Sequence, residues 1–188
     1  MVTARTWSVE DLETLPDDGN RYEIIDGELH VSTQPDWYHQ HVSLRIASAL
    51  DSWSEATGLG GANVAPGVIL SATDAVAPDV VWISTSRMAE AWSPDGKLHA
   101  APEVVVEVLS PGTSNERRDR EAKLQMYSQH GVEEYWIVDW RSRSIDVYRR
   151  DGGCLALAVS LGASDILESP LLPGFHVRVD HIFKNIPA

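Results

Sequence analysis

Charged residues inside apolar strands are the feature that most constrains this chain. Residues 103–109 read Glu-Val-Val-Val-Glu-Val-Leu, a run of strand length that carries Glu107 in its interior. Residues 77–83 form a second such run, which carries Asp79. Carboxylates are costly to bury without a partner. The sequence therefore predicts that Asp79 and Glu107 lie at a site where another group offsets their charge.

Two kinds of partner would satisfy these carboxylates. If the two strands are neighbours, Asp79 and Glu107 converge at one edge of the sheet, where they repel each other unless a cation or a proton joins them. Hard oxygen ligands of this kind suit Mg²⁺, with Mn²⁺ as a possible substitute. A bound metal could activate water and stabilise charge on a phosphate. The alternative is a buried pair held by arginine side chains or backbone amides.

A helix is expected over residues 113–130, after the Glu107 strand. Thr113 and Glu116 have the spacing of a capping box, and Gly131 is the expected stop. Lys123 lies on this helix and could turn towards the sheet to stabilise a phosphate or orient water. Alternatively, Lys123 forms a surface ion pair with Asp119, one turn earlier.

Other polar residues on the predicted helices leave similar choices open. Three arginines near the start of this helix could bind phosphates or could form a solvated helix start: Arg117, Arg118 and Arg120. His39 and His41 are two residues apart, so on a helix they point to different faces and do not form a zinc pair. They could line the entrance to the site, or cap the helix or lie at the surface.

The rest of the chain reads as a mixed sheet with flanking helices. Asp26-Gly27 predicts a hairpin between residues 22–25 and 28–31, and Asp36 can cap a helix over residues 37–53. Residues 84–101 look like a loop with at most one helical turn. Further strands are expected at residues 63–70, 134–140, 145–148, 155–160, 166–167 and 175–179. This order predicts an α/β (α+β) fold in a single domain over residues 1–188, with its core at about 8–180, an N-terminal β-hairpin and additional C-terminal strands.

Composition limits the function. The net charge of −13 argues against a surface that coats nucleic acid non-specifically. The charge is uneven, because residues 103–150 carry 9 acidic and 8 basic side chains, and the rest of the chain carries 19 acidic and 7 basic side chains.

The single cysteine, Cys154, excludes an internal disulfide and a cysteine-rich zinc site. There is no apolar run of membrane-spanning length and no signal-peptide pattern, so we expect a cytoplasmic protein.

Longer motifs resemble a known nuclease family. Pro78-Asp79, then Glu107-Val108-Leu109, and then Lys123 on a helix are similar to the PD-(D/E)xK nuclease superfamily. Within it, the chain resembles the Uma-type restriction endonuclease family over roughly residues 8–180. The motifs that carry this narrower resemblance are residues 21–28, 77–81, 103–111, 123–127 and 131–139.

The resemblance implies a restriction-endonuclease-like core with Asp79 and Glu107 as metal ligands. The chain departs from the superfamily pattern at Leu109, where a lysine is expected. In the family the lysine has moved to the helix, which matches Lys123. Superfamily sites often hold a further acidic residue; Glu28 is the candidate and Glu23 the alternative, although either could be solvated.

These observations give two function hypotheses. The first is a Mg²⁺-dependent endonuclease that hydrolyses nucleic-acid phosphodiester bonds, with DNA as the expected substrate; RNA and single strands are not distinguished from duplex DNA. The second is a catalytically weak or inactive nuclease-fold module for binding or assembly, which the net charge favours. A homodimer is expected because a small nuclease that cuts both strands often needs two copies. Residues 135–137 and the late strands would supply its apolar edges.

Overall fold

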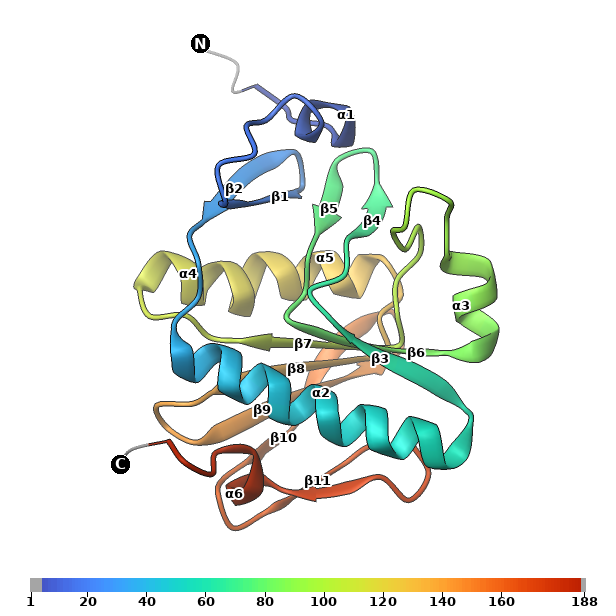
Figure 1. Cartoon of the computed structure of the whole chain (residues 1–188), viewed down its shortest axis with the longest axis vertical. Helices are drawn as coiled ribbons and strands as arrows, with labels where there is room; N and C mark the ends of the chain where they lie inside the picture. The colour runs from blue at the N-terminus through green and yellow to red at the C-terminus, as the bar shows by residue number, and fades with distance from the viewer. Residues whose placement is uncertain (1–4, 187–188) are drawn as a thin grey trace.

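A six-stranded mixed sheet forms the centre of the computed structural model, which describes residues 5–186 (Figure 1). Strands β7 and β8 are parallel, and every other neighbouring pair in this sheet is antiparallel. This confirms the mixed α+β class predicted from the sequence. In spatial order the strands are β10 (Cys154–Leu161), β9 (Ser144–Asp151), β8 (Glu134–Asp139), β7 (Val104–Val108), β6 (Val80–Ser84) and β3 (Gly60–Val64).

A smaller four-stranded antiparallel sheet lies above the large sheet in Figure 1. Its order is β2 (Glu28–Ser32), β1 (Arg21–Ile25), β5 (Asp74–Val76) and β4 (Val68–Ser71). The hairpin of β1 and β2 turns at Asp26 and Gly27, whose φ angles are 50° and 73°. Two positive φ angles define the turn that Asp-Gly favours, so the predicted hairpin is confirmed.

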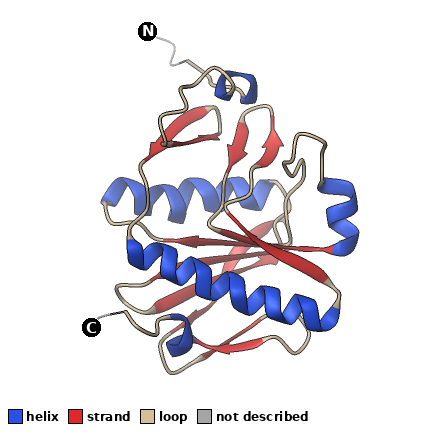
Figure 2. Cartoon of the chain, in the orientation of Figure 1, coloured by secondary structure: helices blue, strands red, loops and turns tan. Residues whose placement is uncertain are grey.

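Helices cover both faces of the large sheet (Figure 2). The long helix α2 (Trp37–Thr57) begins at Asp36, whose carboxylate accepts hydrogen bonds from two backbone N–H groups, as predicted. On the opposite face, α4 (Thr113–Arg117), the π-helical η1 (Arg118–Lys123) and α5 (Leu124–Gln129) run on without a break. They make the crossover that the parallel strands β7 and β8 require. The shorter elements are α1 (Val9–Leu12), α3 (Thr85–Ala91), β11 (Ile166–Glu168), β12 (His176–Arg178) and α6 (Val179–Ile182).

Alternation along β7 decides which face of the sheet Glu107 occupies. Val104, Val106 and Val108 belong to the apolar core beneath α2 and α6. Val105 belongs to the core on the other face, which is shared with α5 and the small sheet. Successive side chains of a strand point to opposite faces, so Glu107 lies on the same face as Val105. The carboxylate is therefore directed towards α5 and the small sheet.

Several local predictions are wrong. The strand expected at residues 63–70 is two strands in different sheets, β3 and β4, separated by Ala65 with φ 46° and by Pro66, which lacks an N–H group. Residues 84–101 contain α3, which Ser84 caps. The capping box at Thr113 does not form, because Gly112 occupies the N-cap position.

The apolar edge expected at residues 135–137 is also absent. These residues lie on β8, which is buried between β7 and β9 and so offers no edge for a second copy. The late strand β10 does lie at an edge of the large sheet. Within residues 5–186, no helix is both long and apolar enough to cross a membrane.

Two leucines on α2 give a matched test of the core. Leu50 is fully buried, whereas Leu44 is 59% exposed. We expect Leu50→Ala to lower the free energy of unfolding by about 2–5 kcal/mol, because it removes core contacts and leaves a cavity. Leu44→Ala should change it by no more than about 0.5 kcal/mol. Urea denaturation of both variants checks this, and equal losses would contradict the packing described.

Candidate active site

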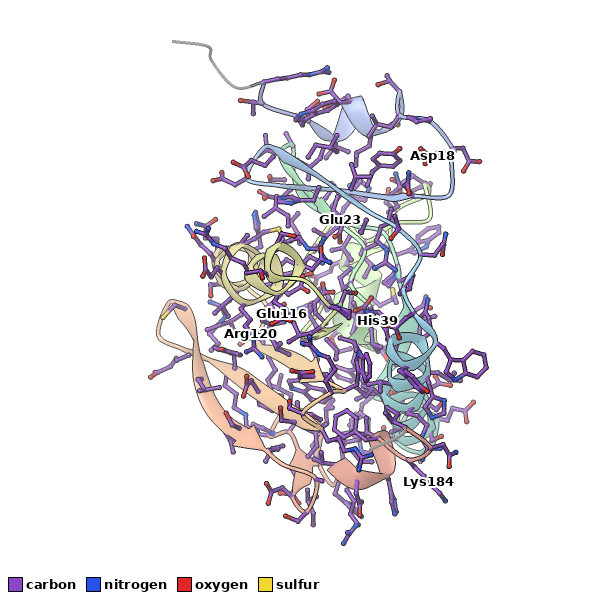
Figure 3. All side chains as sticks on the ribbon, turned by 90° about the vertical axis from the view of Figure 1, so that its left-hand side faces the viewer. Asp18, Glu23, His39, Glu116, Arg120 and Lys184 are labelled. Carbon is purple, nitrogen blue, oxygen red and sulfur yellow. The ribbon has the colours of Figure 1, made fainter. Side chains whose placement is uncertain are left out.

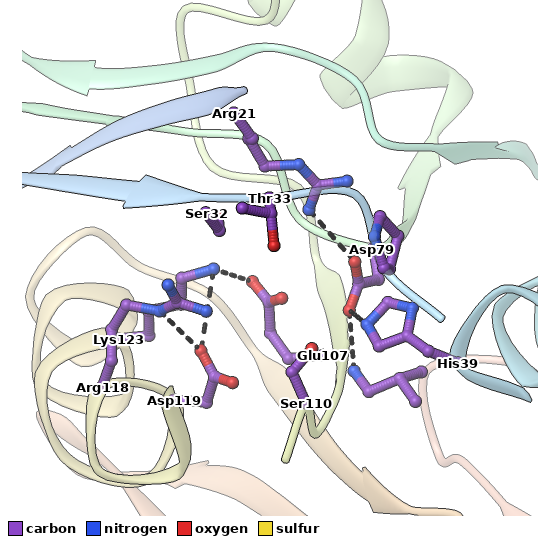
Figure 4. Close-up of a pocket in the computed structure, with 12 residues that line it drawn as sticks. Arg21, Ser32, Thr33, His39, Asp79, Glu107, Ser110, Arg118, Asp119 and Lys123 are labelled. Carbon is purple, nitrogen blue, oxygen red and sulfur yellow. Dashed lines mark hydrogen bonds and ion pairs between the residues drawn. The ribbon is translucent and has the colours of Figure 1, made fainter. Parts of the chain in front are cut away.

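A buried ion pair between Glu107 and Lys123 forms the centre of the site (Figure 4). The ammonium Nζ of Lys123 lies 2.8 Å from Oε1 of Glu107 and 3.1 Å from Oε1 of Glu23. Tyr127 donates its hydroxyl to the same Glu107 oxygen at 2.9 Å. The Lys123 side chain is only 1% exposed. One lysine therefore joins the large sheet, through Glu107, to the small sheet, through Glu23.

Asp79 lies just before β6 and is held by donors from three other segments. Arg21 on β1 donates to Oδ1 at 3.2 Å, and the backbone N–H of Val108 donates to Oδ2 at 2.9 Å. Nε2 of His39, on α2, lies 3.0 Å from Oδ2. The other ring nitrogen of His39, Nδ1, is buried and has no hydrogen-bond partner among residues 5–186. These contacts fix the carboxylate of Asp79 beside Glu107.

The π-helical turn aligns three side chains of the crossover helix. In an α-helix, eight residues rotate the chain about 80° past two full turns, so Asp119 and Tyr127 would point in different directions. A π turn contains more residues, which reduces the rotation per residue. Asp119, Lys123 and Tyr127 are accordingly all buried. Figure 3 shows this helix, with Glu116 and Arg120 labelled, across from His39 on α2.

The surroundings of these groups set their protonation. Burial, with the carboxylates of Asp79, Asp119 and Glu23, raises the pKa of Glu107 to about 8, although Lys123 opposes this. Burial alone would lower the pKa of Lys123, but the three nearest carboxylates outweigh it and hold that pKa above its ordinary value. Burial would raise the pKa of Asp79, but His39 and Arg21 lower it to about 2. Lys123 and Asp79 are thus charged at neutral pH, whereas Glu107 holds a proton more readily than an ordinary glutamate, so its contact with Lys123 is an ion pair only when that proton has been lost.

The site encloses a small polar cavity. Its volume is about 30 Å³, and Asp79, Glu107 and Lys123 line it together with residues of the β2–α2 loop. This volume exceeds the roughly 10–15 Å³ that a cavity needs to hold one water molecule. In the part of the chain that the structure describes, no three His, Cys, Asp or Glu side chains are grouped so as to hold a metal ion. A metal here would have two carboxylates, and its other ligands would be water or substrate oxygens.

The structure brings together Asp79, Glu107 and Lys123, the three residues predicted to carry the chemistry. It does not bring Glu28 to them. The register pairs Glu28 with Ile25 at the turn of the hairpin, and Glu28 is exposed there. Ser32, at the other end of the same strand, lines the cavity. Glu28 lies four residues before Ser32, which places it about 13 Å farther along the strand from the cavity. Glu23, the alternative, is the acidic residue of the hairpin that reaches the site.

Sequence reasoning missed the contact of Arg21 with Asp79, and it gave the entrance to the site as one of several places for His39, which lines the cavity. His39 continues the buried stripe of α2 that includes Val42 and Ile46, so the helical period could have placed it on the inner face. The pairing of Asp119 with Lys123 does occur, at 3.9 Å between Oδ1 and Nζ, but it is buried and not at the surface, and Arg118 Nε lies 3.1 Å from the same oxygen. His41 lies apart from the site and contacts the carbonyl of Lys184.

Removing the charge of Lys123 should destabilise the protein. Lys123→Met leaves Glu107 and Glu23 buried without their cation, and we expect the free energy of unfolding to fall by about 3 kcal/mol or more. Arg117→Met is the control on the same continuous helix, because Arg117 forms an exposed pair with Glu121. That control should change stability by no more than about 0.5 kcal/mol. Chemical denaturation giving equal losses would refute the importance of the buried pair.

Glu107 should also make stability depend on pH. Its pKa rises from 4.5 to about 8 on folding. The stability it contributes is therefore present below about pH 4.5 and is lost as the pH rises through 8. A glutamine side chain cannot titrate, so the free energy of unfolding of Glu107→Gln, relative to that of the unsubstituted protein, should increase across this range. Denaturation in a chelating buffer measures the difference, and a value that does not vary with pH would contradict the raised pKa.

Comparisons with known proteins identify the family and the fold of this chain. A family model described as "Uma2: Putative restriction endonuclease" matches residues 9–180. A solved structure from Anabaena variabilis, described as a putative nuclease belonging to DUF820, is 17% identical, with a TM-score of 0.75. The match covers 94% of this chain and 97% of that one, and at this identity it shows the shared fold. No curated protein matches the chain. Because the family model spans nearly the whole sequence, the chain belongs to the Uma2 family of restriction-endonuclease-like proteins.

Proposed function

We propose that this protein is a metal-dependent endonuclease that hydrolyses phosphodiester bonds, with DNA as its substrate. The observation that carries the proposal is the convergence of Asp79, Glu107 and Lys123 on one small cavity from three different elements. Membership of a family described as restriction endonucleases supports the same reaction class. The substrate and the metal requirement are inferred from the chemistry of these side chains.

The donor set fits Mg²⁺, with Mn²⁺ as a substitute. Mg²⁺ is usually bound by one or two carboxylates, with water and substrate phosphates completing its shell. Asp79 and Glu107 would supply the two carboxylates. The raised pKa of Glu107 indicates that the site disfavours a further negative charge, and a divalent cation would offset it. When bound, the metal would supply Lewis-acid stabilisation of the phosphate and favour deprotonation of water.

The protein's own groups define the remaining roles. Lys123 stays protonated, because the surrounding carboxylates hold its pKa above the ordinary value. It is therefore suited to stabilise negative charge on the phosphate and unsuited to accept a proton. His39 and Arg21 hold Asp79 through its two different oxygens, so that the carboxylates are positioned before a substrate arrives. Tyr127 fixes the orientation of Glu107.

One observation favours the second hypothesis, a non-catalytic binding or assembly module. The buried carboxylates at this site already have partners within the protein, because Lys123 contacts Glu107 and Glu23, and Arg21 contacts Asp79. Such a network can serve a purely structural role. Calorimetry with Mn²⁺ separates the two hypotheses, because the endonuclease requires metal binding that depends on Asp79. The homodimer and the cytoplasmic location stay predictions.

Cleavage of circular DNA tests the endonuclease directly, because a circle has no end for an exonuclease. We expect cleavage with Mg²⁺ or Mn²⁺ and none with a chelator. Asp79→Asn and Glu107→Gln should each slow cleavage by about 100-fold or more, the scale on which loss of one electrostatic contact to a transition state acts.

Glu28→Gln is the matched control, because this exposed carboxylate lies away from the cavity. It should retain cleavage close to that of the unsubstituted protein. Supercoiled duplex and single-stranded circles should both be tried. Equal residual cleavage by Asp79→Asn, Glu107→Gln and the unsubstituted protein would mean that the activity does not come from this site.

A further inference from the structure

A second, larger cavity adjoins the carboxylate cavity. It has a volume of about 340 Å³ and lies between residues 31–36, at the end of β2 and in the β2–α2 loop, and residues 110–118, at the start of the crossover helix. We call it the outer cleft. Residues that line both cavities mark the passage between them, among them Ser32, Thr33, Ser110 and Arg118. A substrate in the outer cleft would therefore lie directly next to Asp79, Glu107 and Lys123.

Arg118 supplies a positive charge to the outer cleft. Its Nε donates to Asp119 at 3.1 Å, whereas Nη1 and Nη2 make no hydrogen bond to any residue between 5 and 186. The side chain is only 12% exposed, so the surrounding protein restricts its position. Among the residues lining the outer cleft, Asp36 is the acidic one, and it caps α2. A guanidinium with free terminal nitrogens is suited to bind a phosphate through two donors.

The dimensions of the site favour a flexible strand. Asp79, Glu107 and Lys123 are no more than 5% exposed, so a phosphate must enter a recess to reach them. Duplex DNA has a persistence length of about 150 base pairs, so bending a short site to bring its backbone into a recess costs elastic free energy. A single strand does not carry this cost. The volume of the outer cleft lies at the lower end of the range for ligand pockets, about 300–1,000 Å³, and suits one nucleotide better than a helix.

We propose that the outer cleft is a subsite for one nucleotide of a single-stranded nucleic acid, and that Arg118 binds the phosphate of that nucleotide. This inference rests on the proposed nuclease function and adds a substrate class to it. The strand would pass between the β2–α2 loop and the start of the crossover helix. Arg118 would hold one phosphate while the neighbouring phosphodiester lies at the inner cavity.

Binding to the Glu107→Gln variant tests this without cleavage. Fluorescence anisotropy with Mg²⁺ would compare a labelled single-stranded DNA oligonucleotide, its duplex, and single-stranded RNA of the same sequence. We expect at least one single strand to bind about tenfold tighter than the duplex. The tighter of DNA and RNA identifies the sugar, and either result supports the subsite. A duplex that binds as tightly as both single strands, or more tightly, would overturn the proposal.

Second-site variants in the same background test Arg118 itself. Arg118→Gln should weaken single-strand binding about tenfold and reduce the slope of log affinity against log salt by about 0.7, which a merely structural residue would not do. Arg118→Lys should keep the slope. Arg117→Gln, at an exposed neighbour, is the control and should change binding less than twofold.

Asn115→Asp covers the case in which Arg118→Gln does not fold. It places a carboxylate in the outer cleft one helical turn from Arg118, where it would compete with a phosphate for the guanidinium, and it should also weaken binding. Unchanged binding by Asn115→Asp and by each Arg118 variant that folds would refute the subsite. A cleavage assay distinguishes failure of the subsite from failure of the proposed nuclease function. Metal-dependent cleavage with a duplex preference would reject only the subsite, whereas Arg118-dependent strand binding without cleavage would reject only the nuclease.

Discussion

The buried contact between Lys123 and Glu107 is the interaction on which the rest of the site depends. Glu107 comes from the large sheet, Lys123 from the crossover helix, and Glu23, the second partner of Lys123, from the small sheet. These contacts of the site are therefore complete only when the small sheet is docked. A buried ion pair is weak evidence for stability, because well-packed apolar residues often serve as well. Its position beside Asp79 is the arrangement that the proposed nuclease would require.

The balance of charge in this cluster explains how it could accept a metal. Four carboxylates meet here, Asp79, Glu107, Glu23 and Asp119, and three permanent cations, Arg21, Lys123 and Arg118, lie among them. Burial would lower the pKa of His39, but Asp79 raises it, so His39 is a further place for a positive charge. With His39 neutral, one negative charge is left over, and the raised pKa of Glu107 indicates where the missing proton would go. A divalent cation would replace that proton. The same balance lets the fold form without a metal, because Glu107 can become neutral.

The sequence predicted the two carboxylates better than the other parts of the site. An isolated charge in an apolar strand is visible at once, so Asp79 and Glu107 could be identified and paired. The direction of Lys123 depends on the π turn, which no periodic pattern records. Glu23 and Glu28 were harder to distinguish from the sequence, because both side chains lie on the same face of the hairpin. Glu23 is opposite His30, and Glu28 is opposite Ile25, two residues after Glu23. Only the way that hairpin docks decides between them.

The net charge of −13 is compatible with a nucleic-acid substrate if binding is local. At physiological ionic strength, charges more than about 8 Å from an exposed phosphate are largely screened. A strand in the outer cleft would therefore sense Arg118 and the nearly balanced charges of the adjoining cluster more than the acidic residues elsewhere on the surface. Screening does not remove the repulsion of a duplex that lies across an acidic surface, because its phosphates would then be close to the acidic side chains. The acidic composition that argues against non-specific duplex binding is thus compatible with recognition of a single strand within a recess.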